Sequence, residues 1–372
     1  TNVYNTAVGM NAGKAVTTAT DVTLIGGRAG DAITTGTDNV AVGSSAMTSN
    51  TAGLRNIAIG SDALFTLNHT TATNGYNIGI GHSAGQNMTT GISNTLIGGL
   101  AGDALTDADL NTAVGYQALS TDTLGSKSTA MGQGSLFSQN FTTATDTHNT
   151  AYGFHSGLSV TVGTINTLIG SLSGDALTTG DSNVAVGYVA LSADTQGDRA
   201  VAIGAGALKT QNFTTATSSN NVAVGYEAGV QNQTGTGLTL IGTQAGENLT
   251  SGSNNTFIGH LAAGQSSITG TLNTSIGYAA LYSLSSGSSN VGLGRDSGRS
   301  GAPGGNVTTA SGQLCLGDEN ITNAHIQVSL TVASDERDKT DFVDLDLGLD
   351  FVKSLEPVTY YWDKRSKYGD KY

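Results

Sequence analysis

The hydrophobic positions of this chain occur in short β-branched runs that recur at a fixed interval. Each run reads asparagine, two or three small or β-branched residues, an aliphatic residue and a glycine, and an alanine or serine follows three residues later. One run of alternating side chains in each copy predicts a short strand, because neighbouring residues of a strand point to opposite faces. The glycine recurs 18 times, at Gly9, Gly26, Gly43, Gly60, Gly81, Gly98, Gly115, Gly132, Gly153, Gly170, Gly187, Gly204, Gly225, Gly242, Gly259, Gly277, Gly294 and Gly317.

The spacing of these glycines predicts the architecture. The successive spacings are 17, 17, 17 and 21, and the set recurs, so a long unit with a period of 72 overlies the short one. The additional residues of the longest spacing fall in Thr-Thr-Ala-Thr segments that begin at Thr70, Thr142 and Thr214. A period of 17 is too short for a helical-pair repeat or a propeller blade. We therefore predict an all-β parallel β-solenoid of about 18 coils, about 85 Å long at about 4.8 Å per coil.

Each recurring position within the repeat has a predicted structural role. The glycine allows a tight corner, through a positive φ or a close backbone approach. The alanine or serine that follows marks a crowded position. The asparagine is predicted to form a ladder in which each side-chain amide bonds the neighbouring coils. The ladder residues are Asn39, Asn56, Asn77, Asn94, Asn111, Asn149, Asn166, Asn183, Asn221, Asn255, Asn273 and Asn290.

The position two residues before the glycine varies between alanine and leucine, and leucine occupies it in the second copy of each long unit. This variation predicts a second, semi-apolar face that a single chain would leave in water. Self-association would cover such a face, and we predict a trimer around the rod axis. The residues alone indicate a need for a partner surface and do not specify its number of copies.

Composition narrows the functional classes. The chain has 53 glycines, two prolines and a formal charge of −13, which argues against nucleic-acid binding because that normally requires a basic face. No apolar run is long enough to cross a membrane, so no membrane insertion is expected. Cys315 is the sole cysteine and the six histidines lack metal-ligand spacing, so neither a metal nor a cofactor is predicted. The chain begins at Thr1 without methionine, and we expect it to be a fragment.

Charge density changes abruptly at Ser334, because more than two fifths of the side chains from there to Tyr372 are charged, against 12% of the whole chain. We predict a solenoid shaft over 1–298, the last coil and a neck strand over 299–333, and a separate α+β segment over 334–372. The neck strand is predicted at 325–332. The spacing of Leu347, Phe351, Val352 and Leu355 predicts a helix over 346–355, and a strand is predicted at 357–362.

The repeats resemble those of known fibrous proteins. The sequence Asn-Thr-Ala-Val-Gly-Tyr-Gln-Ala-Leu at 111–119 and its copies are similar to the head repeats of trimeric autotransporter adhesins and to repeats of phage-type tail fibres. The alternation of short and long coils fits the tail-fibre repeats better. The resemblance covers residues 1–320 and implies a left-handed parallel β-roll assembled as a homotrimer.

The C-terminal segment carries a second resemblance. Ser-Asp-Glu-Arg-Asp-Lys at 334–339, followed by Pro-Val-Thr-Tyr-Tyr-Trp at 357–362, resembles the opening of the endosialidase-type intramolecular chaperone domain. This resemblance implies that Ser334 is a nucleophile, Lys339 its general base and Ala333–Ser334 the bond that is cut, in a single turnover. Asp338 stands where that family usually has an apolar residue. Residues 334–372 correspond to the N-terminal part of the domain, which further helices complete.

These features predict the structural and adhesive shaft of an extracellular or virion tail fibre, with a cell-surface location as the alternative. Its partners would be two further copies of itself and a cell-surface glycan or receptor. A monomeric or oligomeric carbohydrate- or ice-binding solenoid without proteolysis is the competing interpretation. The Thr-Thr-Ala-Thr segments occur only once in each long unit, which disfavours ice binding. The tyrosines after the corner glycine, Tyr116, Tyr188, Tyr226 and Tyr278, would either pack between coils or stack on sugars.

Overall fold

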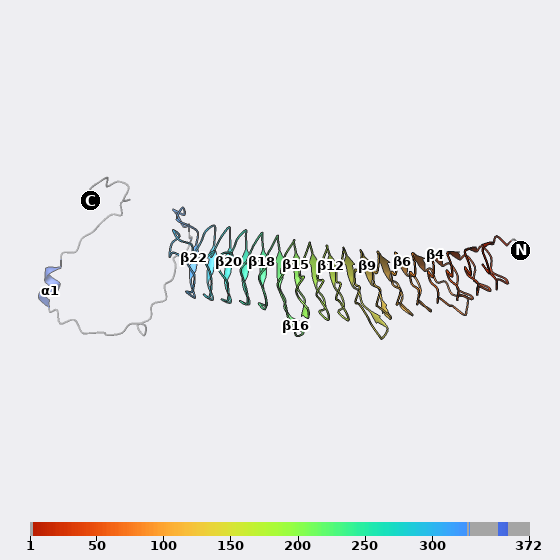
Figure 1. Ribbon diagram of the computed structural model, residues 1–372. Coiled ribbons are helices and arrows are strands. Elements are labelled where there is room, and N and C mark those ends of the chain that lie inside the picture. The colour runs from red at the N-terminus through yellow and green to blue at the C-terminus, as the bar shows by residue number, and fades with distance from the viewer. Residues whose placement is uncertain (1–2, 326, 328–348, 356–372) are drawn as a thin grey trace. The chain divides into compact units, whose positions relative to one another are not determined.

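The computed structural model describes residues 3–325, 327 and 349–355, and its regular structure is almost entirely β. Figure 1 shows the coils stacked one after another from β1 to β22. The strands are β1 (Thr6–Val8), β2 (Thr23–Ile25), β3 (Val40–Val42), β4 (Ile57–Ile59), β5 (Ile78–Ile80), β6 (Thr95–Ile97), β7 (Thr112–Val114), β8 (Gly125–Ser126), β9 (Thr129–Met131), β10 (Thr145–Asp146), β11 (Thr150–Tyr152), β12 (Thr167–Ile169), β13 (Val184–Val186), β14 (Gly197–Asp198), β15 (Val201–Ile203), β16 (Thr217–Ser218), β17 (Val222–Val224), β18 (Thr239–Ile241), β19 (Thr256–Ile258), β20 (Thr274–Ile276), β21 (Val291–Leu293) and β22 (Leu314–Leu316).

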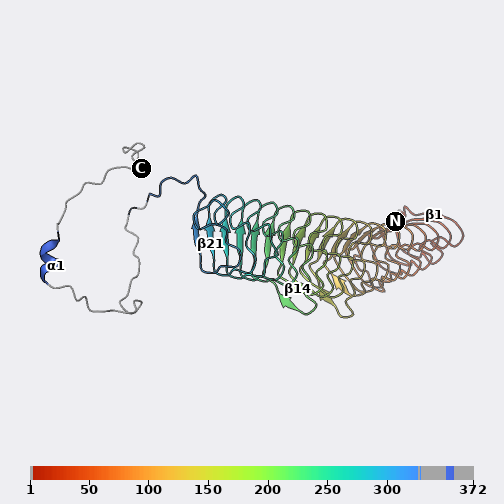
Figure 2. The same cartoon turned by 60° about the vertical axis from the view of Figure 1, so that its left-hand side comes forward.

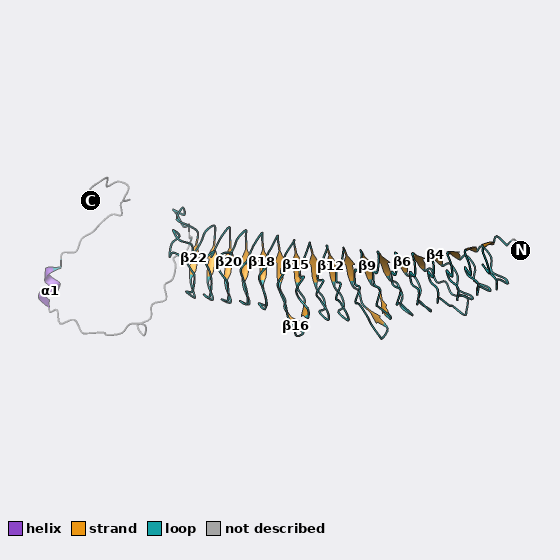
Figure 3. Cartoon of the chain, viewed as in Figure 1, coloured by secondary structure: helices purple, strands orange, loops and turns teal. Residues whose placement is uncertain are grey.

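Eighteen of these strands form one parallel sheet, and each coil contributes a single strand to it. The strands pair in chain order at equivalent positions, so that Val184 of β13 faces Val201 of β15, which in turn faces Val222 of β17. Figure 3 shows these short strands following one another along the stack, joined by turns. The predicted β-solenoid with one strand per repeat is thus confirmed.

The longer coils differ from the others by a protruding loop. In two of them the chain makes an additional parallel pair, β8 with β10 and β14 with β16. The second of these pairs lies at the edge of the stack, away from the main sheet, in Figure 2. The additional residues of the Thr-Thr-Ala-Thr segments are therefore accommodated in loops, and the register of the main sheet is preserved across them.

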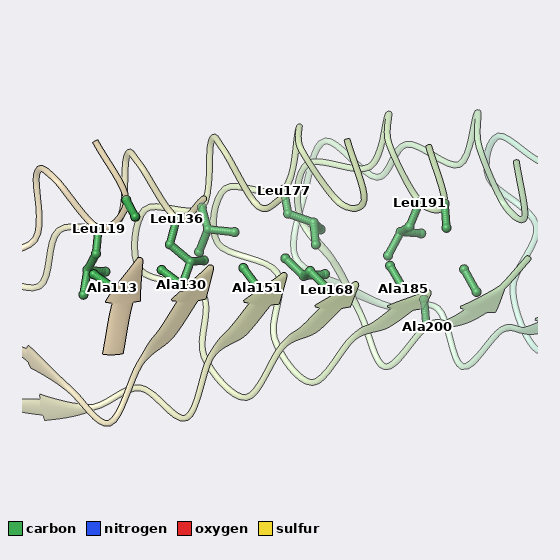
Figure 4. Packing of buried hydrophobic residues seen from close by; sticks show 14 of the residues in the cluster. Ala113, Leu119, Ala130, Leu136, Ala151, Leu168, Leu177, Ala185, Leu191 and Ala200 are labelled. Carbon is green, nitrogen blue, oxygen red and sulfur yellow. The ribbon is translucent and has the colours of Figure 1, made fainter. Parts of the chain in front are cut away.

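The interior of each coil is narrow and filled mainly by alanine and leucine. Figure 4 shows Ala113, Ala130 and Ala185 on the strands, close to Leu119, Leu136 and Leu191 respectively on the facing turns. Where the strand position is alanine, the space is filled in one of two ways. In six coils a large residue lies six positions later, as for Ala113 with Leu119. Ala7, Ala151 and Ala223 have a glycine there instead, and a leucine of the next coil fills the space, as Leu168 does beside Gly157. Where the strand position is leucine, the residue six positions later is glycine, as for Leu24, Leu96, Leu168 and Leu240 with Gly30, Gly102, Gly174 and Gly246.

This complementarity overturns one prediction from the sequence. The alanine or leucine two residues before the corner glycine was expected to form a second exposed face, but it points into the coil. Leu96 and Leu168 are fully buried, and a Cβ added to Gly174 would lie 2.8 Å from a methyl group of Leu168. An inward leucine is thus accommodated by a glycine six residues later in its own coil, because a close-packed interior tolerates no additional side chain there.

The corner glycines occupy conformations that other residues rarely adopt. Gly187 has a φ of +137°, and a Cβ added to it would lie 2.6 Å from the carbonyl carbon and oxygen of Gly204 in the next coil. The same close approach recurs along the stack, as at Gly43 against Gly60 and at Gly132 against Gly153. Both reasons proposed for the glycine, a positive φ and a close backbone approach, therefore hold.

The chain divides into two compact units, Thr1–Thr322 and Asn323–Tyr372. The first contains the whole solenoid, including β22 of the last coil. In the second, the structure describes the helix α1 (Leu349–Ser354), which lies within the predicted helix 346–355. The predicted strand at 357–362, and all but residues 325 and 327 of the predicted neck strand, lie outside the described residues.

The glycine corners can be tested by adding one methyl group. We expect Gly187→Ala to lower the free energy of unfolding by about 1–3 kcal/mol or more, because the methyl group meets backbone at a strained φ. Gly27→Ala is the matched control, because nothing lies within 4 Å of its added Cβ. Denaturant unfolding followed by circular dichroism compares the two. Equal midpoints for the two variants would contradict the role of the corner.

Candidate functional site

The predicted asparagine ladder lines one side of the coil interior. All twelve residues are at most 1% exposed. The Asn166 side chain shows the pattern: its Nδ2 donates to the Gly180 carbonyl at 2.9 Å, and its Oδ1 accepts from the Asn183 backbone N–H at 3.0 Å. Eleven of the twelve amides bond the backbone of the next coil at two points in this way. Asn56 accepts from the Asn77 N–H but donates to the Leu54 carbonyl of its own coil. Such buried polar groups stabilise only when they are satisfied.

The residue whose backbone N–H donates to a ladder asparagine need not itself be an asparagine. Asn111 and Asn183 accept from the backbone N–H groups of Ser128 and Ala200, where the repeat lacks an asparagine. Asn5 in the first coil makes the same pair of bonds, to Val22 and Ala19, although it was not among the predicted ladder residues. The asparagine's role is thus to bridge backbones, and its geometry supplies no reactive group.

Two fully buried carboxylates were not predicted from the sequence. Asp194 Oδ2 accepts from Gln211 Nε2 at 2.7 Å, and its Oδ1 accepts from the backbone N–H groups of Phe213 and Gly197. Asp122 makes the equivalent bonds to Gln139, Phe141 and Gly125, one long unit earlier. Each carboxylate holds the start of a protruding loop. The signal in the sequence was the recurrence of the Asp and Gln pair at equivalent positions of two successive long units.

The environment of these carboxylates is polar but lacks a compensating cation. Burial raises the pKa of Asp194, while the hydrogen bonds from Gln211, Phe213 and Gly197 oppose that shift. In the first long unit the corresponding positions are Asn50 and Leu67. A neutral amide therefore takes the place of the acid where the glutamine donor is missing, which agrees with the cost of an unpaired buried charge.

The described residues offer no metal centre. Within residues 3–325, 327 and 349–355, no three His, Cys, Asp or Glu side chains gather around a common point. Asp103 and Asp175 follow glycines one long unit apart and lie in separate coils, and burial raises the pKa of each. Cys315 is buried, and burial also raises the pKa of its thiol.

The outer face of the main sheet is uncharged and open to solvent, with threonine at ten of its eighteen first strand positions and apolar residues or tyrosine at the third. Outward side chains come from the first and third residues of each strand, and not one of them is charged on any of the eighteen strands. The third position carries isoleucines that remain more than a third exposed, including Ile59, Ile169, Ile203 and Ile241 at 38–39%. Parallel sheets are ordinarily covered on both faces, so this face is unusual for an isolated chain.

The tyrosines after the corner glycine lie at the surface of the solenoid. Tyr116, Tyr188, Tyr226 and Tyr278 remain 47–59% exposed. The predicted catalytic residues Ser334 and Lys339 lie outside the described residues, and so does the Ala333–Ser334 bond. Over the part of the chain that the structure describes, no helix is long and apolar enough to span a membrane.

The raised pKa of Asp194 makes stability depend on pH. A carboxyl group that binds its proton more tightly in the folded state stabilises most below its ordinary pKa of 3.8 and loses that contribution as pH rises through the raised value. The wild type should therefore gain stability relative to Asp194→Asn as the pH falls from 7 to about 4. Thermal unfolding measured between pH 7 and about 4 checks this prediction. The control is Asp21→Asn, because Asp21 is exposed. A difference in stability between the wild type and Asp194→Asn that does not change with pH would contradict a raised pKa for Asp194.

Comparison with known proteins bears on the C-terminal segment. A family model for the chaperone of endosialidase matches residues 334–372. No curated protein matches the chain. The segment that follows the solenoid is therefore similar to the chaperone of endosialidase, in keeping with a fibre-type protein that carries its own chaperone.

Proposed function

We propose that this chain is the shaft of a homotrimeric extracellular or virion fibre, and that its C-terminal segment aligns three chains and then cuts itself off before Ser334. The observation that carries the proposal is a chaperone-like segment directly after a solenoid whose outer sheet face is uncharged along its whole length. The solenoid has no catalytic cluster among its described residues. A structural and adhesive role therefore fits it better than substrate turnover.

The sheet face supports self-association. Its third strand positions carry isoleucine or valine in most coils, so a second copy in the same register would meet a similar row over the stack. Obligate interfaces between identical chains are more apolar than the rest of a protein surface, and this row of third positions has that character. Three chains arranged around the rod axis would each turn this face inward, which is the arrangement that the fibre resemblance implies.

Uniform repeats create a problem of register that a chaperone would solve. A slip by one coil moves each outward residue opposite a nearly identical one, so the wrong pairing costs little. A terminal clamp that aligns the three chains before the shaft closes would remove these alternatives. Removal of the clamp after assembly would make unfolding effectively irreversible, which suits a fibre outside the cell.

The proposed cleavage requires only groups within the matched segment and the residue before it. The Ser334 hydroxyl would attack the carbonyl carbon of Ala333, while the amine of Lys339 accepts the hydroxyl proton. The protonated Lys339 then gives this proton to the Ser334 nitrogen as the bond between that nitrogen and the Ala333 carbonyl carbon breaks, and water hydrolyses the resulting ester of Ala333 with the Ser334 hydroxyl. A lysine can serve as this base when burial lowers its pKa.

Mass spectrometry of the full-length natural protein tests the cleavage. We expect a fragment that begins at Ser334 in the wild type and an uncut chain in Ser334→Ala, because that variant lacks the nucleophile. Ser354→Ala, a serine of α1 outside the proposed machinery, should be cut like the wild type. The same fragment in Ser334→Ala, or an uncut wild type, would contradict the proposal.

A further inference from the structure

The residue directly after the corner glycine is aromatic in every second coil over the middle of the solenoid. We call these residues the aromatic row; they are His82, Tyr116, Phe154, Tyr188, Tyr226 and His260. The intervening coils carry Gly99, Gln133, Ser171, Ala205 and Thr243 at this position. Tyr188 and Tyr226 are 59% and 53% exposed, whereas the Phe154 ring, 46% exposed, stacks on the His155 ring with centroids 3.8 Å apart.

The spacing of the row leaves room for another ring between its members. Strands stack at about 4.8 Å, so aromatic residues two coils apart are separated by about 9.6 Å. Where aromatic residues occupy adjacent coils the gap closes: the rings of His260 and Tyr278 meet edge to face, with centroids 5.5 Å apart. Between Tyr188 and Tyr226 the intervening coil carries the small Ala205, which leaves that slot open, whereas Gln133 occupies this position between Tyr116 and Phe154.

The slot between Tyr188 and Tyr226 is the best formed. The two tyrosines line one surface hollow of about 180 Å³, and Ala205 lies between them. Lys209 and Glu227 line the same hollow and add a donor and an acceptor. The Glu227 carboxylate accepts from Gln244 Nε2 at 3.2 Å, and its hydrogen bond and charge raise the pKa of the Tyr226 phenol.

These features match the chemistry of a sugar ring. The electron-rich faces of tyrosine attract the C–H groups on the flat side of a pyranose, while a donor and an acceptor beside them suit its hydroxyls. A nucleic acid would bring phosphates to a chain whose formal charge is −13. Slots at a regular pitch also suit a ligand that is itself a repeating polymer, because weak sites then act together.

We propose that the aromatic row binds a linear glycan of uncharged hexopyranoses that runs along the solenoid, with the Tyr188–Tyr226 slot as its best-formed subsite. This inference adds a receptor class to the proposed fibre. It rests on the proposed function only for its biological setting, since the slot belongs to a single chain.

Titration of the full-length protein with hexasaccharides tests the proposal by saturation-transfer NMR. The probes are cellohexaose, chitohexaose and maltohexaose. We expect saturable binding of at least one of them, with a Kd of about 1 mM or lower. The variant Tyr116→Ala/Phe154→Ala/Tyr188→Ala/Tyr226→Ala should bind that probe at least about tenfold more weakly, because the faces of the slots are gone.

Two further variants make the result specific. The control Tyr76→Ala/Leu110→Ala/Ile165→Ala/Leu272→Ala removes four side chains that are 53–59% exposed elsewhere on the solenoid, and it should bind like the wild type. Ala205→Trp fills the best slot and should lower the number of hexasaccharides bound per chain, with an unchanged circular dichroism spectrum.

The outcomes separate this inference from the proposed fibre. No saturable binding of any probe at about 10 mM, or equal binding by the four-alanine row variant, would overturn the glycan site. Light scattering on the same samples reports the number of chains. A trimer that binds no glycan would contradict only this inference, whereas a monomer that binds glycan through the row would contradict only the fibre.

Discussion

The close stacking of successive coils at the corner glycines is the constraint on which the structure depends. At Gly43, Gly132 and Gly187 even one added methyl carbon would meet backbone of the next coil at 2.3–2.6 Å. This approach keeps each strand beside its equivalent and puts each ladder asparagine within reach of the next backbone. The interior is close-packed as well, so the buried Leu168 side chain requires a glycine at position 174, where an added Cβ would lie 2.8 Å from it.

The same constraint determines what lies on the surface. The coil interior buries mainly alanine, leucine and asparagine, while the isoleucines at the third strand position and the tyrosines after the corner glycine point outward. On the sheet face they form an uncharged surface that repeats at every coil. After the corner they form a row of rings with gaps. Both surfaces inherit the period of the stack, which is why each is suited to a repeating partner: further copies of the chain on the sheet face and a polymer on the row. Near-identical repeats also explain why a C-terminal chaperone segment is useful.

The period could be predicted from the sequence because every coil repeats the same corner and the same strand. The asparagine ladder was predictable for the same reason, since Asn166 and Asn183 are equivalent residues in stacked coils. The inward direction of the alanine or leucine position was not, because strand alternation defines two faces without saying which one is buried. The Asp194–Gln211 pair was missed because its partners lie in different coils and meet only after stacking. The geometry of Ser334 and Lys339 lies outside the described residues, so their roles continue to rest on resemblance.

Native mass spectrometry of the intact protein tests the central claim, that the uncharged sheet face is covered by identical chains. The account predicts the mass of three chains at micromolar concentration. It also predicts loss of that species when Ile169, Ile203 and Ile241 are changed to glutamate, because like charges would then face one another in a buried interface. A wild-type protein with the mass of a single chain would contradict the account, and so would a trimer that the three glutamates leave unchanged.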